Sequence, residues 1–123
     1  MPSPQQMEAA VHEYLRALNA SDLDAVVALF ADDATVEDPV GTPPKRGIAE
    51  IRAFYVGSVA LKLSLALEGQ VRVAGSEAVF PFSVSFSYQG QPTTIRPIDV
   101  FRFNEAGKIV SMRAFFGPAN TSH

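Results

Sequence analysis

The spacing of hydrophobic residues in the first half of the chain predicts three helices. Ser3 can cap the first helix, because Gln6 stands at the capping-box position. A second, short helix is expected to start at Ser21 and to end before Asp32-Asp33. A third follows a loop rich in Gly and Pro and is expected to end near Gly57. Their apolar positions, at helical spacing, are Met7, Ala10, Val11, Tyr14, Leu15 and Leu18, then Leu23, Val26, Val27 and Phe30, then Ile48, Ile51, Phe54 and Tyr55.

After the third helix the hydrophobic period changes to two, which is typical of half-buried β-strands. The expected strands are Leu61–Leu67, Val71–Val73, Phe80–Tyr88, Thr94–Phe103 and Lys108–Phe116, and Gly117–His123 is expected to be a polar tail. Helices followed by a run of antiparallel strands predict an α+β fold. A curved sheet wrapped around the helices would form a cone with an apolar interior.

Composition narrows the class of protein. The 123 residues fit one domain spanning 1–123, and 47% hydrophobic against 19% charged residues indicates a globular fold. The net charge is −3 and no Lys/Arg cluster occurs, which argues against nucleic acid or an anionic membrane as partner. No cysteines are present, and no signal-peptide pattern or membrane-length apolar run is found. We therefore expect a soluble, cytoplasmic protein.

One carboxylate lies on an apolar face of an extended segment, Ala34–Gly41. Alternation places Val36, Asp38 and Val40 on one face and Glu37 on the other. A carboxylate on an apolar face is unfavourable unless it is paired, neutralised or used. Asp38 is therefore a candidate catalytic residue, and a solvated aspartate at a turn is the alternative.

Two more polar groups are expected to point into the core. Asp99 shares a strand face with Ile95, Pro97, Phe101 and Phe103, where desolvation should raise its pKa and keep it protonated. Tyr14 lies in the apolar stripe of the first helix, so its hydroxyl needs a partner inside. The alternatives are an ion pair of Asp99 with Arg96 or Arg113, and a purely structural Tyr14.

Asp38, Tyr14 and Asp99 together would suit one kind of reaction. One carboxylate base facing two neutral donors would suit proton abstraction beside a carbonyl, with no metal or cofactor. Aromatic residues are also more numerous on the strand faces than a small core requires, which suggests a pocket for a flat apolar ligand, with ordinary core packing as the alternative. These residues are Phe80, Phe82, Phe86, Phe101 and Phe116.

The combination resembles the ketosteroid isomerases (steroid Δ5-isomerases) of the cone-shaped nuclear-transport-factor-2-like superfamily, which has a SnoaL-like, cystatin-like fold. The similarity runs from Tyr14-Leu15 through Leu29–Pro39 to Pro97-Ile98-Asp99 and Phe101-Arg102-Phe103. The motif Ala-Asp-Asp-Ala-Thr-Val-Glu-Asp-Pro, residues 31–39, is specific to this group. The helix-then-sheet layout is shared by many relatives.

The resemblance implies a role for each matching residue. Asp38 matches the general base, and Tyr14 and Asp99 match the oxyanion-hole donors, the latter a carboxylic acid kept neutral. Tyr55 matches a tyrosine that hydrogen-bonds the first donor. Phe30 stands where some members carry a further tyrosine, so the hydrogen-bond network should be one link shorter. Positions matching the lining of the steroid pocket are Phe54, Phe82, Val84, Phe86, Phe101, Met112, Ala114 and Phe116.

The resemblance also implies the reaction and the partners. A 3-oxo-Δ5-steroid would lose a proton to Asp38, form a dienolate and regain the proton two carbons along, without a metal or cofactor. A homodimer through the sheets is implied, and the polar face of Ser83, Ser85 and Ser87 could contact water or a wet dimer interface. Two other functions remain open, a non-catalytic binder of apolar small molecules and a related epoxide hydrolase or polyketide cyclase.

Overall fold

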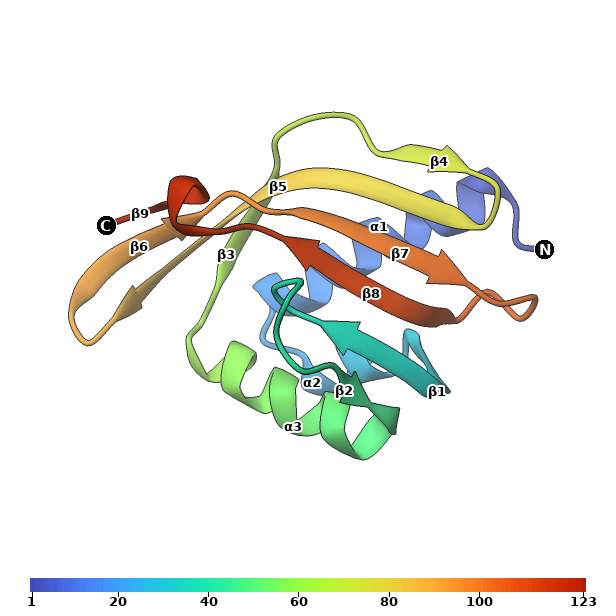
Figure 1. Cartoon of the computed structure of the whole chain (residues 1–123), viewed down its shortest axis with the longest axis horizontal. Coiled ribbons are helices and arrows are strands. Elements are labelled where there is room, and N and C mark those ends of the chain that lie inside the picture. Colours follow the sequence, from blue (N-terminus) through green and yellow to red (C-terminus); the bar gives the residue numbers. More distant parts are fainter.

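The computed structural model describes all 123 residues as helices, strands and their connections (Figure 1). The helices are α1 (Pro4–Asn19), α2 (Leu23–Val27) and α3 (Gly47–Ala60), followed late in the chain by the 3-10 turn η1 (Pro118–Asn120). No helix is both long and apolar enough to cross a membrane. The strands are β1 (Phe30–Glu37), β2 (Lys45–Arg46), β3 (Ser64–Leu67), β4 (Arg72–Ala74), β5 (Glu77–Tyr88), β6 (Gln91–Ile95), β7 (Ile98–Phe103), β8 (Ile109–Phe115) and β9 (Thr121–Ser122).

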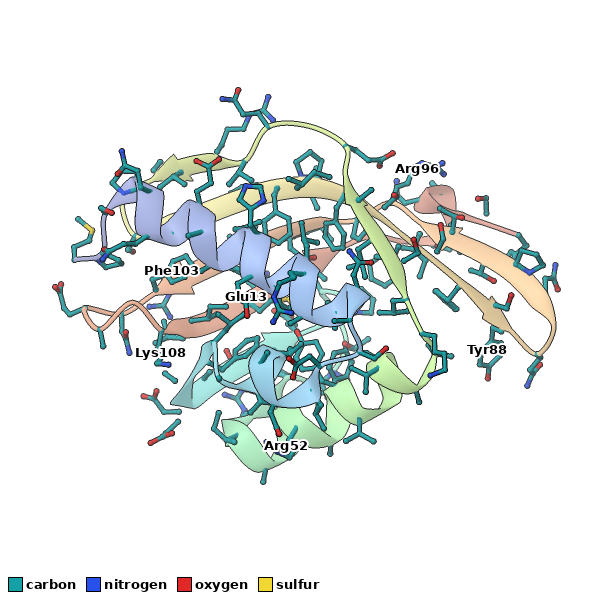
Figure 2. All side chains as sticks on the ribbon, turned by 180° about the vertical axis from the view of Figure 1, so that it is seen from behind. Glu13, Arg52, Tyr88, Arg96, Phe103 and Lys108 are labelled. Carbon is teal, nitrogen blue, oxygen red and sulfur yellow. The ribbon has the colours of Figure 1, made fainter.

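The strands form one curved, unclosed sheet in the order β2-β1-β8-β7-β5-β6-β9, with β3 and β4 also paired to β5. Helix α1 lies across one face of this sheet (Figure 2), and α3 packs against β1. The α+β cone is therefore confirmed. The expectation of a wholly antiparallel sheet is wrong, because β1 runs parallel to β8. Helix α3 and the strands that follow it carry the chain back between β1 and β8, which makes a parallel pairing possible.

The sheet bends where β5 changes partners. The first part of β5 pairs with β7 through Pro81, and its second part pairs with β3 and with β6. The expected single strand Thr94–Phe103 is accordingly two strands, interrupted at Arg96-Pro97. Pro97 has no N–H to donate to a ladder. Its carbonyl accepts from the N–H of Phe82 at 3.2 Å, and the N–H of Arg96 donates to Asn120 at 2.9 Å.

The helix boundaries agree with expectation for α1 and differ for α2 and α3. Ser3 and Gln6 form the predicted capping box. Asp22 rather than Ser21 caps α2, and its carboxylate accepts from the N–H of Ala25 at 3.1 Å. Helix α3 is three residues longer than expected and ends at Ala60, so the segment that begins at Leu61 becomes a strand only at β3.

Two other segments adopt structure that local sequence did not indicate. Phe30 was expected in the second helix and Asp32-Asp33 directly after it, but all three residues belong to β1, because pairing with β8 begins at Phe30 opposite Ile109. The expected polar tail contains η1 and β9, which pairs with β6. In both cases the hydrogen-bond partners lie far away in the sequence.

The core lies between the helices and the concave face of the sheet. Twenty-three buried hydrophobic residues form one cluster, and Asp99 is the one charged residue buried with them. Tyr88, by contrast, is 55% exposed near the tip of the β5–β6 hairpin, although alternation placed it on the apolar face (Figure 2). The hairpin extends beyond the helices there, so no element covers Tyr88.

Candidate active site

A cavity of about 180 Å³ is lined by residues of α1, α3 and the sheet. Tyr14, Asp38, Tyr55 and Asp99 all line it, so the structure brings the four predicted polar residues together. Thirteen of the seventeen lining residues are hydrophobic when the two tyrosines are counted among them. Apart from the four named, the lining consists of Leu18, Phe54, Ser58, Leu61, Leu63, Leu65, Phe82, Val84, Phe86, Ile95, Pro97, Ala114 and Phe116.

Strand β8 brings the two aspartates to neighbouring places. Asp99 in β7 is the register partner of Ala114 in β8. On the other side of β8, β1 ends with Glu37 opposite Arg113, and the N–H of Val40 donates to the carbonyl of Ala114 at 2.8 Å. Asp38 therefore lies beside Ala114 on one side of β8, with Asp99 on the other. The small side chain of Ala114 leaves space between them.

Glu37 turns away from the cavity, as alternation along the strand predicts. Its carboxylate accepts a hydrogen bond from Arg113 Nε at 3.0 Å, and this bond lowers the pKa of Glu37. The adjacent acids thus have separate surroundings. Glu37 forms an ion pair on the outer face, and Asp38 lies against apolar groups.

Asp99 is buried without a cationic partner. Its side chain belongs to a residue that is only 1% exposed, and Oδ1 has no hydrogen-bond partner. The two arginines considered as partners are engaged elsewhere, Arg113 with Glu37 and Arg96 with Glu68 at 3.3 Å. Burial, with a smaller contribution from the charge of Asp38, raises the pKa of Asp99 well above its usual value. Burial therefore favours the protonated, neutral form of Asp99.

The pKa of Asp38 is also raised, but less than that of Asp99. Burial raises its pKa from 3.8 to about 6, and the positive charge of Lys45 opposes the increase. At neutral pH most Asp38 side chains are therefore ionised, in the same cavity where burial favours the protonated form of Asp99. A carboxylate poised near neutrality is suited to accept and return a proton.

The hydroxyls of Tyr14 and Tyr55 share a buried hydrogen bond of 2.8 Å. Burial raises the pKa of both residues well above 10, so both remain protonated. The rings of Phe101 and Tyr14 pack edge to face with their centroids 5.0 Å apart, which holds the Tyr14 ring in place. Phe30 packs 5.8 Å from the Tyr55 ring and has no hydroxyl to continue the chain of hydrogen bonds.

Six of the eight predicted pocket residues line the cavity, and two do not. Phe101 and Met112 are both fully buried register partners in β7 and β8. The ring of Tyr14, which does line the cavity, packs edge to face against Phe101. Phe101 and Met112 therefore belong to the buried core and not to the cavity wall. Phe101 and Met112 have residue types and strand faces like those of the residues that line the cavity. Alternation alone therefore could not separate core residues from cavity-lining residues.

Seven lining residues were not predicted as pocket residues. The alternating leucines of Leu61–Leu65 predicted a buried strand face. The pattern did not indicate that this face lines the cavity. Ser58 lies one helical turn beyond Phe54 and Tyr55, which gave a usable signal. The seven residues are Leu18, Ser58, Leu61, Leu63, Leu65, Ile95 and Pro97. No group of three or more His, Cys, Asp and Glu residues is arranged to hold a metal ion.

Comparison with known proteins identifies the family. The SnoaL-like domain matches residues 11–112. The chain belongs to the SnoaL-like family. This SnoaL-like chain is 41% identical over 115 residues to a steroid delta-isomerase of Nocardioides simplex, which covers 94% of this chain and 93% of that protein. The expected NTF2-like fold and the resemblance to steroid isomerases are thereby confirmed.

Other SnoaL-like relatives have different chemistry. The chain is 31% identical over 135 residues to the epoxide hydrolase LasB of Streptomyces lasalocidi, matching 99% of this chain but only 45% of that protein. Among solved structures, the epoxide hydrolase/cyclase-like enzyme SalBIII, which has a role in pyran ring formation in the polyether salinomycin, superposes with a TM-score of 0.93. SalBIII is 29% identical, and the match covers 99% of this chain and 98% of that one. The fold thus hosts isomerases and hydrolase/cyclase enzymes.

Proposed function

We propose that this protein is a steroid Δ5-isomerase that converts 3-oxo-Δ5-steroids to 3-oxo-Δ4-steroids by intramolecular proton transfer. The observation that carries the proposal is the pairing of one ionisable and one protonated aspartate in a single apolar cavity. Asp38 has a pKa of about 6, whereas burial holds the pKa of Asp99 well above its usual value. The similarity to the steroid delta-isomerase supports an isomerase.

The reaction begins with Asp38. Its carboxylate accepts the proton from the carbon between the 3-ketone and the Δ5 double bond, and the electron pair moves toward the ketone oxygen to form a dienolate. A positioned acid–base group typically contributes about 10²- to 10⁴-fold in rate. No cofactor is required, because the same proton is transferred twice.

Two neutral donors stabilise the dienolate oxygen. Tyr14 and protonated Asp99 each donate a hydrogen bond to it, and the dry aromatic surroundings strengthen both bonds. Because a tyrosine hydroxyl has one proton, Tyr14 can donate to the substrate only if Tyr55 donates within the 2.8 Å pair. Tyr55 therefore orients Tyr14. In the last step protonated Asp38 gives the proton back two carbons along, on the same face of the substrate, to form the conjugated enone.

The shape of the cavity fits a flat substrate held at one end. Its volume of about 180 Å³ is smaller than the roughly 300–1,000 Å³ of typical sites for drug-sized ligands. We expect the reacting rings to occupy the interior beside Asp38 and Asp99. The remaining rings would extend past the half-buried Leu61 and Leu63 toward solvent.

The test is to add the protein to a 3-oxo-Δ5-steroid and follow the ultraviolet absorbance of the conjugated enone. The proposal expects enzyme-dependent growth of this absorbance, strongly reduced in Asp38→Asn. An epoxide-bearing polyketide substrate tested in parallel addresses hydrolase/cyclase chemistry. Turnover of the epoxide with no enone formation, or steroid binding without turnover, would reject the isomerase.

We also propose that two copies associate through the outer face of the sheet. Ile98 and Phe115 are register partners in β7 and β8 and are 45% and 42% exposed. Two such residues side by side form an exposed apolar patch of the kind that marks interaction sites. Phe115→Glu should convert a dimer to a monomer in sedimentation velocity, whereas Val56→Glu on the exposed face of α3 should not. A wild-type monomer at high micromolar concentration would refute the proposal.

A further inference from the structure

The short strand β2 places a lysine on the inner side of the sheet edge. Lys45 is the antiparallel register partner of Val36, and Arg46 is the partner of Thr35. Directly opposed residues of paired strands share one face. Val36 is fully buried on the cavity side, so Lys45 shares that side, while exposed Arg46 shares the other. Asp38 lies two residues beyond Val36 in the same chain direction.

The ammonium group of Lys45 is held in place without a carboxylate partner. Its Nζ lies 5.3 Å from the centroid of the Phe54 ring, and Phe54 lines the cavity together with Asp38. A cation over an aromatic face is attracted by the ring quadrupole. No acidic group lies within ion-pair distance of Lys45, whereas Arg16, Arg52, Arg96 and Arg113 all have such partners.

We propose that Lys45, held over the Phe54 ring, is a positioning residue that serves as the counter-charge of ionised Asp38. The consequence for catalysis rests on the proposed isomerase function, but the electrostatic pairing does not. Among the groups around Asp38, Tyr14 of α1, Tyr55 of α3 and Asp99 of β7 are neutral. Glu37 of β1 is engaged with Arg113 on the outer face. Lys45 is therefore the cation that acts on this carboxylate.

This counter-charge favours the form of Asp38 that accepts a proton. Burial raises the pKa of Asp38 to about 6, and Lys45 opposes the increase. Without Lys45, a larger fraction of Asp38 would be protonated and inactive below neutral pH. Once ionised, however, Asp38 would be a slightly stronger base. Loss of Lys45 should therefore reduce the rate at acidic pH and leave the rate on the alkaline plateau nearly unchanged.

The direct experiment measures the ionisation of Asp38 without using turnover. Carbon-13 NMR of side-chain carboxyls follows Asp38, assigned by its loss in Asp38→Asn, across pH in wild type, Lys45→Gln, Lys45→Arg and Arg46→Gln. Lys45→Gln should move the midpoint upward by roughly half a pH unit at low salt. The difference should shrink in 1 M salt. Lys45→Arg should restore the wild-type midpoint.

Arg46→Gln is the matched control, because it removes the same charge from the neighbouring residue on the opposite face. An equal shift in Arg46→Gln, or no shift in Lys45→Gln, would overturn the pairing. The acidic limb of kcat/KM for the 3-oxo-Δ5-steroid should move with the NMR midpoint. If the steroid is not turned over, the proposed function fails, and the NMR titration still decides the role of Lys45.

Discussion

Asp38 and Asp99 stand on either side of Ala114 in one cavity, yet their surroundings differ. Asp99 is in β7, in the interior of the sheet, where Oδ1 has no partner and no cation is near. Asp38 follows β1 close to the edge of the sheet, where Lys45 in β2 opposes the effect of burial. Burial without an ion-pair partner therefore favours the protonated form of Asp99 in the middle of the sheet, whereas the pKa of Asp38 near the edge rises only to about 6.

The position of each strand in the sheet accounts for this difference in surroundings. Asp99 lies in β7, which has a paired strand on each side, and the residue is only 1% exposed. A segment near the edge, followed by a loop that returns as β2, allows a charged side chain to approach Asp38. The ionised form of Asp38 adds to the burial of Asp99 and raises its pKa further, so the two groups help to maintain their difference.

Asp38→Asn removes the ionisable member of the pair, and we expect the largest effect. Loss of the proton acceptor should reduce kcat by roughly 10²- to 10⁴-fold. Binding of a 3-oxo-Δ4-steroid product should change little, because the amide is nearly isosteric with the acid. Stopped-flow or steady-state enone absorbance, with product binding by calorimetry, measures both. Near-normal turnover would show that Asp38 is not the base.

Asp99→Leu removes the protonated member and should cost about 3 to 4 kcal/mol of transition-state stabilisation, a loss of roughly 10²- to 10³-fold in kcat. Asp99→Asn keeps an N–H donor and should lose much less. Steady-state kinetics of the two variants compares them directly. Equal losses in both variants would argue that the proton of Asp99 is not what the reaction uses.

The raised pKa of Asp99 predicts that the free energy of unfolding depends on pH. Unfolded Asp99 releases its proton above about pH 4, whereas the folded form keeps it to much higher pH because burial raises the pKa. Within that window the unfolded state binds fewer protons, so the wild type loses about 1.4 kcal/mol of unfolding free energy per pH unit from this group. Asp99→Asn lacks this loss, so urea denaturation should show its relative stability rising with pH. A constant difference would mean that Asp99 ionises normally.

Tyr55→Phe should have the smallest effect, because it changes a group that acts through Tyr14. A hydrogen bond of this kind contributes about 0.5 to 1.5 kcal/mol, so kcat should decrease by roughly 2- to 10-fold with KM nearly unchanged. Tyr14→Phe, measured beside it, should lose more. A larger loss in Tyr55→Phe than in Tyr14→Phe would reverse the proposed order of donors.

Much of this fold could be predicted from hydrophobic periodicity, because α1, β5 and β8 each bury one clear face. What could not be predicted depends on distant partners. The 3-10 turn and β9 form because β6 presents a free edge, and Phe30 enters β1 because Ile109 lies opposite it. The break at Arg96-Pro97 follows from the change of partners along β5.

The candidate site was predicted more fully than its surroundings. Asp38, Tyr14, Tyr55 and Asp99, which line one cavity, were singled out because polar groups on apolar faces are unusual and because the resemblance assigned them roles, which stay predictions. Phe101 and Met112 were misplaced because depth along the cone cannot be read from alternation. Lys45 was overlooked because its importance depends on the β1–β2 register and on the position of Phe54.

The central claim is that Asp38 and Asp99 differ in ionisation within one cavity, and carboxyl carbon-13 NMR across pH tests it most directly. Assigned by Asp38→Asn and Asp99→Asn, the Asp38 carboxyl should titrate near pH 6, and the Asp99 carboxyl should show the shift of a protonated acid throughout neutral pH. An ionised Asp99 at pH 7, or two carboxyls that both titrate near pH 4, would contradict the account.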